Sequence, residues 1–312
     1  MRKTAINMIL ELAKKNEKVF FIGSDLSDDI LRQFTKEMPR RFFMEGISEA
    51  NIIGMAAGLA LEGKIVYVNT IATFLTRRCF EQLVVDLCLH QANVRLIANG
   101  GGLVYAPLGP THQAIDDIGI LRAIPNMAIV APADANEMKK IMEASLNHKG
   151  PLYIRLAKGY DPIVTDEVSP LTIGKAVLVR AGKDALVATT GITLKTALDA
   201  AEELKKEGIE ISILHNHTIK PLDQEAIEKN AKNVPVIISI EEHNIIGGLG
   251  SAVAEIIAEA NFTQPKKFKR IAIPDVFADE YGSQASLMKK YSITTEHLVK
   301  TIKELLQKTS IP

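Results

Sequence analysis

Short apolar runs alternate with longer amphipathic segments along this chain, and the alternation constrains the fold more than any other feature. Strands that alternate with helices and are apolar on both faces form a parallel sheet with helices on each side. We therefore predict an α/β unit of three layers in the first half. Its expected strands are residues 19–22, 42–44, 64–68, 93–98, 127–131 and 152–156, and its expected helices include 4–16, 74–91, 115–123 and 135–147.

A second alternating unit follows a segment that has no periodicity. Residues 158–172 contain two prolines, which is typical of a connection between domains. We expect a first domain at residues 1–160, a linker at 161–180 and a second α/β domain at 181–312. The second domain's expected strands are 185–191, 209–214, 234–240 and 270–273, and its expected helices are 193–207, 222–231, 248–260 and 295–307.

Composition excludes several classes of protein. The chain has 312 residues, 47% of them hydrophobic, and 37 basic residues balance 37 acidic ones. These values argue against disorder and against a basic surface for nucleic acid. No apolar run approaches the ~20 residues that span a bilayer, and the start does not resemble a signal peptide. Cys79 and Cys88 lie in an apolar run without metal-ligand spacing, so we expect reduced, buried thiols in a cytoplasmic protein.

One acidic residue stands in an otherwise apolar, small-residue helix. Glu49 precedes apolar residues at helical spacing, and Gly54 and Gly58 form an edge that another backbone can approach closely. We expect this helix to be buried or packed at an interface. A carboxylate in the first turn either caps the helix or takes part in chemistry, and the helix pattern alone leaves both alternatives open.

Four segments together resemble the transketolase family. Residues 46–60 are similar to its glutamate motif, and 73–82 to the segment that packs on the pyrimidine of thiamin. Residues 109–113, Gly-Pro-Thr-His-Gln, resemble its substrate-histidine loop, and 239–251 resemble the hallmark of its carboxy-terminal domain. The four occur in the family's order. The resemblance implies a pyrimidine-binding domain with a mainly parallel sheet, followed by a transketolase C-terminal domain.

The resemblance also implies thiamin diphosphate as cofactor. Glu49 matches the glutamate that protonates the aminopyrimidine ring, so that the cofactor's imino form can deprotonate the thiazolium carbon. Phe74, Arg77 and Phe80 match positions beside the pyrimidine, at a spacing that also fits a core cluster on one helix face. Asp25 matches an aspartate near the cofactor.

Three residues match substrate positions. His112 corresponds to the histidine that hydrogen-bonds the donor's oxygen, although a histidine in a loop is also often merely solvated. Arg155 corresponds to an arginine that holds the acceptor's phosphate, with Lys158 nearby. An arginine after a buried strand can equally pair with a carboxylate. Glu242 and His243, which belong to the carboxy-terminal hallmark, are expected to organise that domain and a subunit contact.

Several positions depart from the transketolase pattern. Leu108 replaces an aspartate that reads sugar hydroxyls, and Asp29 replaces a serine that touches phosphate. Glu45 also departs, before the Gly-Ile of the glutamate motif. Arg77 follows the pattern of deoxyxylulose phosphate synthases, whereas transketolases usually have an aromatic residue there. These departures favour an unusual sugar, or one without a phosphate, over the common pentose phosphates.

No Gly-Asp-Gly segment for magnesium and diphosphate is present. The resemblance therefore implies a split enzyme, in which this C-terminal subunit pairs with an N-terminal diphosphate-binding subunit that supplies the magnesium ligands. Two copies of each would form a heterotetramer that moves a two-carbon ketol unit between sugars or sugar phosphates. A decarboxylating enzyme stays open as an alternative, either similar to deoxyxylulose phosphate synthase or as the beta chain of a 2-oxoacid dehydrogenase. A non-catalytic regulatory subunit is a further alternative.

Overall fold

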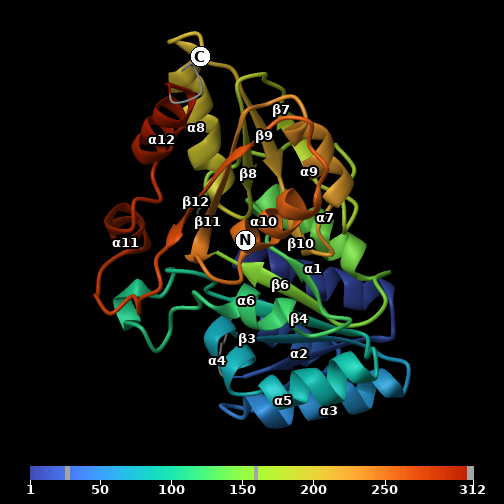
Figure 1. The fold of residues 1–312 in the computed structure, drawn as a ribbon. Coiled ribbons are helices and arrows are strands. Elements are labelled where there is room, and N and C mark those ends of the chain that lie inside the picture. Colours follow the sequence, from blue (N-terminus) through green and yellow to red (C-terminus); the bar gives the residue numbers. More distant parts are fainter. Residues whose placement is uncertain (25–28, 158–160, 308–312) are drawn as a thin grey trace.

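The protein contains two mostly parallel sheets, which appear in Figure 1 as a lower, blue-to-green unit and an upper, yellow-to-red unit. The computed structural model describes residues 1–24, 29–157 and 161–307. No helix within these ranges is long and apolar enough to cross a membrane.

The first sheet has seven strands in the order β10-β5-β6-β4-β3-β1-β2. Neighbouring strands are parallel, except that β10 runs antiparallel to β5. The strands are β1 (Val19–Gly23), β2 (Phe42–Met44), β3 (Ile65–Ile71), β4 (Val94–Asn99), β5 (Ala128–Val130), β6 (Leu152–Leu156) and β10 (Thr218–Lys220).

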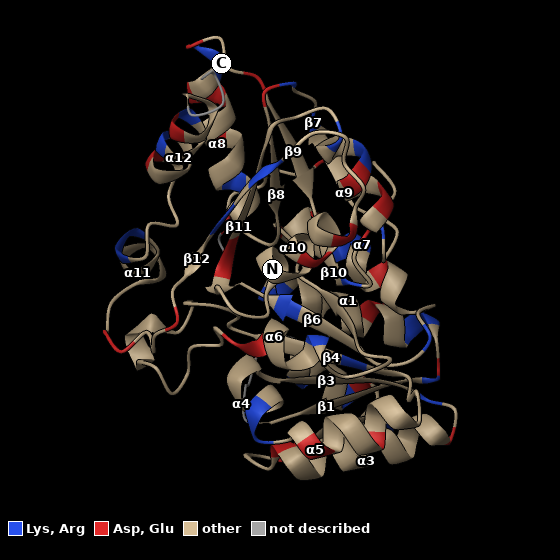
Figure 2. Cartoon of the chain, viewed as in Figure 1, with Lys and Arg blue, Asp and Glu red and all other residues tan. Residues whose placement is uncertain are grey.

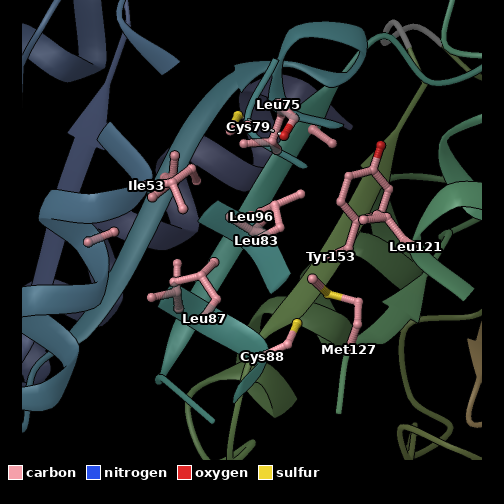
Figure 3. Packing of buried hydrophobic residues seen from close by; sticks show 14 of the residues in the cluster. Ile53, Leu75, Cys79, Leu83, Leu87, Cys88, Leu96, Leu121, Met127 and Tyr153 are labelled. Carbon is pink, nitrogen blue, oxygen red and sulfur yellow. Dashed lines mark hydrogen bonds between the residues drawn. The ribbon is translucent and has the colours of Figure 1, made fainter. Parts of the chain in front are cut away.

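Alternate side chains of these strands enter two separate hydrophobic clusters. On β3, Val66 and Val68 join a cluster with α3, α4, η2 and α6, whereas Tyr67 joins a cluster with α1, α2 and α7. Figure 3 shows part of the first cluster. The first sheet is therefore the middle layer of three. Its helices are α1 (Arg2–Lys15), α2 (Asp29–Glu37), α3 (Glu49–Leu61), α4 (Ala72–Arg77), α5 (Phe80–Gln82), α6 (Asp117–Arg122) and α7 (Ala135–Ser145), with short helices η1 (Pro39–Arg41) and η3 (Ala106–Leu108) and the π-helix η2 (Leu83–Leu89).

The second sheet has five strands in the order β12-β11-β8-β9-β7, parallel except for β7. Its faces are also separated, because Ala185 and Val187 of β8 pack with α8 and α12, while Leu186 and Ala188 pack with α9 and α10. The elements are β7 (Val177–Arg180), β8 (Ala185–Thr189), β9 (Ile211–His215), β11 (Val236–Asn244), β12 (Lys267–Ile273), α8 (Thr193–Lys205), α9 (Gln224–Ala231), α10 (Leu249–Glu259), α11 (Gln284–Lys290) and α12 (Thr295–Gln307).

The predicted fold class, two three-layer α/β units, is confirmed, but three local features differ from the sequence prediction. The helix expected at residues 74–91 consists of α4, α5 and η2, because the backbone leaves helical geometry at Cys79 (φ −122°, ψ 27°). β7 lies within residues 161–180, where we expected a linker. β10 was not predicted, and it extends the first sheet from a position far along the chain.

Candidate active site

Glu49 is the first residue of α3, and its side chain is 5% exposed. Its two carboxylate oxygens accept hydrogen bonds from Nη1 of Arg78 at 3.2 and 3.3 Å. The preceding Ser48 directs its hydroxyl away from the helix, to the carbonyl of Glu45 at 2.9 Å. Glu49 is therefore held beside a cation from the α4–α5 connection, a contact that capping of its own helix does not require.

Arg78 connects Glu49 to an aromatic residue. Its guanidinium carbon lies 3.6 Å from the centroid of the Phe74 ring, which is cation–π geometry. The His112 ring meets the same Phe74 ring edge-on, with centroids 5.1 Å apart and planes at 66°. The four side chains come from α3, the α4–α5 connection, α4 and the loop before α6. They form a contiguous row that contains a carboxylate, an aromatic wall and an imidazole.

Contrary to the sequence prediction, Arg77 and Phe80 do not lie together on one helix face with Phe74. Arg77 forms a bidentate ion pair with Asp116, with both N–O distances at 2.9 Å. Phe80 begins α5 and is 40% exposed. The prediction that Phe74, Arg77 and Phe80 share one helix face is wrong, because α4 ends at Arg77 and Cys79 turns into the core (Figure 3).

Arg155 pairs with a buried carboxylate, which was the alternative to phosphate binding that the sequence left open. It is 7% exposed, and its Nε donates to Asp117 Oδ2 at 2.8 Å. Burial lowers the pKa of Arg155, but Asp117 outweighs this effect and holds that pKa above its usual range. Asp117 forms the carboxylate pair that the sequence left open for this arginine, and binding of a substrate phosphate by Arg155 stays a prediction. Asp25 and Lys158, two further predicted site residues, lie outside the described residues, as does the side chain of Asp29.

Arg78 was not selected from the sequence. The signal was present as the second of two adjacent arginines, four residues after Phe74, a spacing that places two side chains on the same face of a helix. Asp116, which orients Arg77, was missed because nothing in its neighbourhood distinguishes it from a helix-capping aspartate.

The site has polar groups that fit a polar ligand. Thr73 and Gln113, which flank Phe74 and His112 in sequence, are 3% and 1% exposed. The Thr73 hydroxyl and both polar atoms of the Gln113 amide have no hydrogen-bond partner among the described residues. Buried polar atoms are normally satisfied, so this part of the site fits an aminopyrimidine or sugar group better than an apolar one. Within the same ranges, no group of three or more His, Cys, Asp or Glu could hold a metal ion.

The fold consists of two α/β domains, and the first domain places an acid at a helix start in a row with an aromatic ring and an imidazole, an arrangement that fits part of a cofactor site. Comparison with known families agrees. The model of the transketolase pyrimidine-binding domain matches residues 1–160, and the model of the transketolase C-terminal domain matches residues 174–298. The chain belongs to the transketolase family and has the two domains of its C-terminal half.

Several similar proteins are subunits of about the same length as this chain. The 6-deoxy-6-sulfo-D-fructose transketolase subunit SqwH of a Clostridium species is 34% identical, over 99% of this chain and 95% of that one. An apulose-4-phosphate transketolase subunit of Actinobacillus succinogenes is 40% identical, over 89% of each chain. A solved split-gene transketolase in an inactive β4 tetramer superposes with a TM-score of 0.88 at 33% identity, over 98% of this chain and 97% of that one.

Proposed function

We propose that this chain is the C-terminal subunit of a split transketolase that transfers a two-carbon ketol unit between sugars or sugar derivatives. The observation that carries the proposal is the row of Glu49, Arg78, Phe74 and His112. It combines the acid and the aromatic wall needed at an aminopyrimidine with an imidazole for a substrate oxygen. Thiamin diphosphate, when bound, supplies the carbanion chemistry that amino acid side chains lack.

Each side chain of the row has a separate task in this proposal. Glu49 would hold and exchange the proton at a ring nitrogen of the pyrimidine, and Arg78 fixes the position of the Glu49 carboxylate with its two hydrogen bonds. Phe74 forms one wall of the pyrimidine site. His112, whose Nδ1 lies 2.9 Å from the Thr111 hydroxyl, directs a proton toward the donor's oxygen with its other ring nitrogen.

A partner subunit completes the site in this proposal. Asn51, Gly54, Gly58 and Leu61, which follow one face of α3, are all exposed, and a side chain on Gly58 would meet nothing within 4 Å. Apart from Glu49, α3 carries no charged residue, and its ribbon is mostly tan in Figure 2. We propose that the diphosphate-binding subunit, with its magnesium ligands, packs here and that two such pairs form a heterotetramer.

Cytoplasmic placement, supported by two free buried cysteines, belongs to the same proposal.

The substrate is proposed to be a specialised sugar. Leu108, in the position where an aspartate would read a sugar hydroxyl, is 49% exposed beside the His112 loop. Two similar proteins are named for 6-deoxy-6-sulfo-D-fructose and for apulose 4-phosphate, and each of these sugars carries an anionic group. We therefore expect a ketose that carries an anionic group and is not selected by a carboxylate at position 108.

The test is reconstitution with the diphosphate-binding chain from the same genome, thiamin diphosphate and magnesium. The expected result is transfer of a ketol unit from a ketose donor to an aldose, and a complex of two chains of each kind by native mass spectrometry. Glu49→Gln is the matched control, since it preserves volume and removes the acid. Release of carbon dioxide from pyruvate without ketol transfer would instead support the decarboxylating alternative. A complex that is folded but inactive on every donor would support the regulatory one.

A further inference from the structure

The loop that carries His112 is closed at its base. Gly102 donates a backbone hydrogen bond to Ala114 O at 2.8 Å, and Ala114 donates back to Gly102 O at 3.0 Å. Inside the loop, the His112 amide donates to Gly109 O at 3.1 Å. Residues 102–114 therefore form a compact loop of the Ω type, in which the position of His112 depends on how the base is held.

This loop is seated on the C-terminal domain. Leu103 and Ala106 are fully buried in the hydrophobic cluster that α8 and α12 build over the second sheet. On the other side of the loop, a Cβ on Gly109 would lie 2.9 Å from the Tyr281 ring, so the ring packs directly on the backbone three residues before His112. The loop belongs to the first domain by sequence and to the second by packing.

One carboxylate of the second sheet reaches the loop base. Glu242 of β11 is 3% exposed, and its Oε1 accepts a hydrogen bond from the Leu103 amide at 2.7 Å. Gln284 Nε2 donates to both oxygens of this carboxylate, at 2.9 and 3.0 Å. Arg155 closes the other end, because its Nη2 donates to Ala114 O at 3.0 Å and to Glu242 O at 2.9 Å.

The backbone of Gly102 and the Glu242 side chain are in direct contact, with no space for a larger residue at position 102. Gly102 has a φ of +68°, and a Cβ there would lie 2.5 Å from Cδ of Glu242. Only glycine combines that backbone conformation with so close an approach. The carboxylate is therefore pressed against the base of the loop from the side of the second domain.

We propose that Glu242 is a positioning residue of the active site. Through the Leu103 amide and the Gly102–Ala114 base, it holds the loop so that His112 meets Phe74 and the donor substrate. The C-terminal domain thereby controls reactivity toward the donor, while proton exchange at the cofactor depends on Glu49 and does not use this loop. The catalytic part of the inference rests on the function proposed above.

The first measurement does not depend on activity. Amide hydrogen exchange of residues 103–115 is compared by mass spectrometry in the wild type, Glu242→Ala and Glu242→Gln. The matched control is Glu241→Ala, because Glu241 is equally buried on the same strand but accepts from Leu249 and Gly250 at the start of α10. We expect Glu242→Ala to speed exchange of the loop at least about tenfold, since an opening free energy lower by about 1.4 kcal/mol has that effect. Glu241→Ala should affect residues near 249–252 instead.

The second measurement uses the complex with its partner subunit. For Glu242→Ala we expect kcat/KM for the donor to fall by about ten- to a hundredfold, the cost of a small misplacement of a catalytic group. Exchange of the thiazolium C2 proton of bound thiamin diphosphate should keep its wild-type rate. Glu242→Gln should restore donor turnover, because the amide oxygen still accepts from Leu103.

The results separate the two proposals. A wild-type complex without ketol transfer overturns the proposed function, and the exchange data then still decide whether Glu242 holds the loop. If transfer is found, unchanged loop exchange or unchanged donor kcat/KM in Glu242→Ala overturns the inference. Should that variant not fold, Gln284→Met removes the partner of Glu242 without altering the carboxylate, and a loop whose exchange is unaffected in Gln284→Met has the same meaning.

Discussion

The ion pair between Arg155 and Asp117 leads to a quantitative prediction for Arg155→Met. Asp117 is fully buried and Arg155 is 7% exposed, so removal of the arginine leaves an uncompensated charge in the interior. Breaking a buried pair in this way costs about 3–5 kcal/mol of unfolding free energy. An exposed pair gives the matched control: Arg180→Met, which removes a pair with Glu202 whose side chain is 68% exposed, should cost less than about 1 kcal/mol.

A double mutant separates the pair from the other bonds of Arg155. In Arg155→Met/Asp117→Asn neither buried charge remains, so the combined cost should be lower than the sum of the single costs by about 2 kcal/mol. Equilibrium urea unfolding with a common m-value measures Arg155→Met, Asp117→Asn, the double variant and Arg180→Met. If Arg155→Met costs no more than Arg180→Met, the guanidinium is not an internal partner of Asp117, and a substrate phosphate would again be its natural ligand.

The loss of unfolding free energy in Arg155→Met should depend on pH in a defined direction. Burial raises the pKa of Asp117, but the charge of Arg155 and then that of His243 outweigh burial and hold that pKa below its usual value. A lowered carboxyl pKa stabilises the fold at neutral pH, and this stabilisation is lost as the pH falls through the folded pKa. The cost of Arg155→Met should therefore be largest near pH 7.5 and shrink toward pH 4, where Asp117 of the variant is protonated. A cost that is constant over this range would contradict the reasoning.

Three further predictions follow from single residues. Glu49→Gln should lower ketol transfer by at least about a hundredfold, the usual contribution of an acid–base group, with an unchanged thermal transition; retained turnover would refute its role. Burial raises the pKa of Cys79 to about 12 and that of Cys88 to about 11, so neither thiol should react with Ellman's reagent at pH 8 until urea is added. Burial lowers the pKa of His217 to about 4, and a lowered histidine pKa means that stability is lost as the pH falls below about 6.5, by up to about 1.4 kcal/mol per unit. His217→Gln should lose less stability between pH 7 and pH 5 than the wild type, and equal urea midpoint shifts would contradict this.

The layers of the fold were predictable because each long strand is an apolar run with its own helix. β8 and β11 show the rule, since every residue of β8 is buried and only the last residue of β11 is not. β10 shows its limit. The three residues of β10, Thr218–Lys220, carry no local signal that they pair with Ile129 and Val130 of the first domain, because only the tertiary structure brings the two segments together.

The site was predictable to the extent that local sequence determines it. Glu49 at a helix start and His112 in a loop need only local patterns, and Arg78 and Phe74 connect the two in the structure. The placement of Phe80 on the helix face of Phe74 and Arg77 assumed a continuous helix through Cys79. No proline or glycine marks the break, and the buried thiol, which lies 3.0 Å from the Leu75 carbonyl, belongs to a core that the sequence does not display.

Because β10 follows the second domain's β9 in sequence but pairs with β5 in the first sheet, the chain cannot simply be cut between its two domains. A fragment that ends after β6 would leave β5 as an open edge, and unpaired edges promote aggregation. The fragment would also lose the hydrogen bond from the Ala131 amide to His217 O at 2.8 Å. Expression of the first domain alone would therefore need residues up to Lys220, which belong to the second. An exchange of one domain for that of a relative must therefore keep the β5–β10 pairing intact.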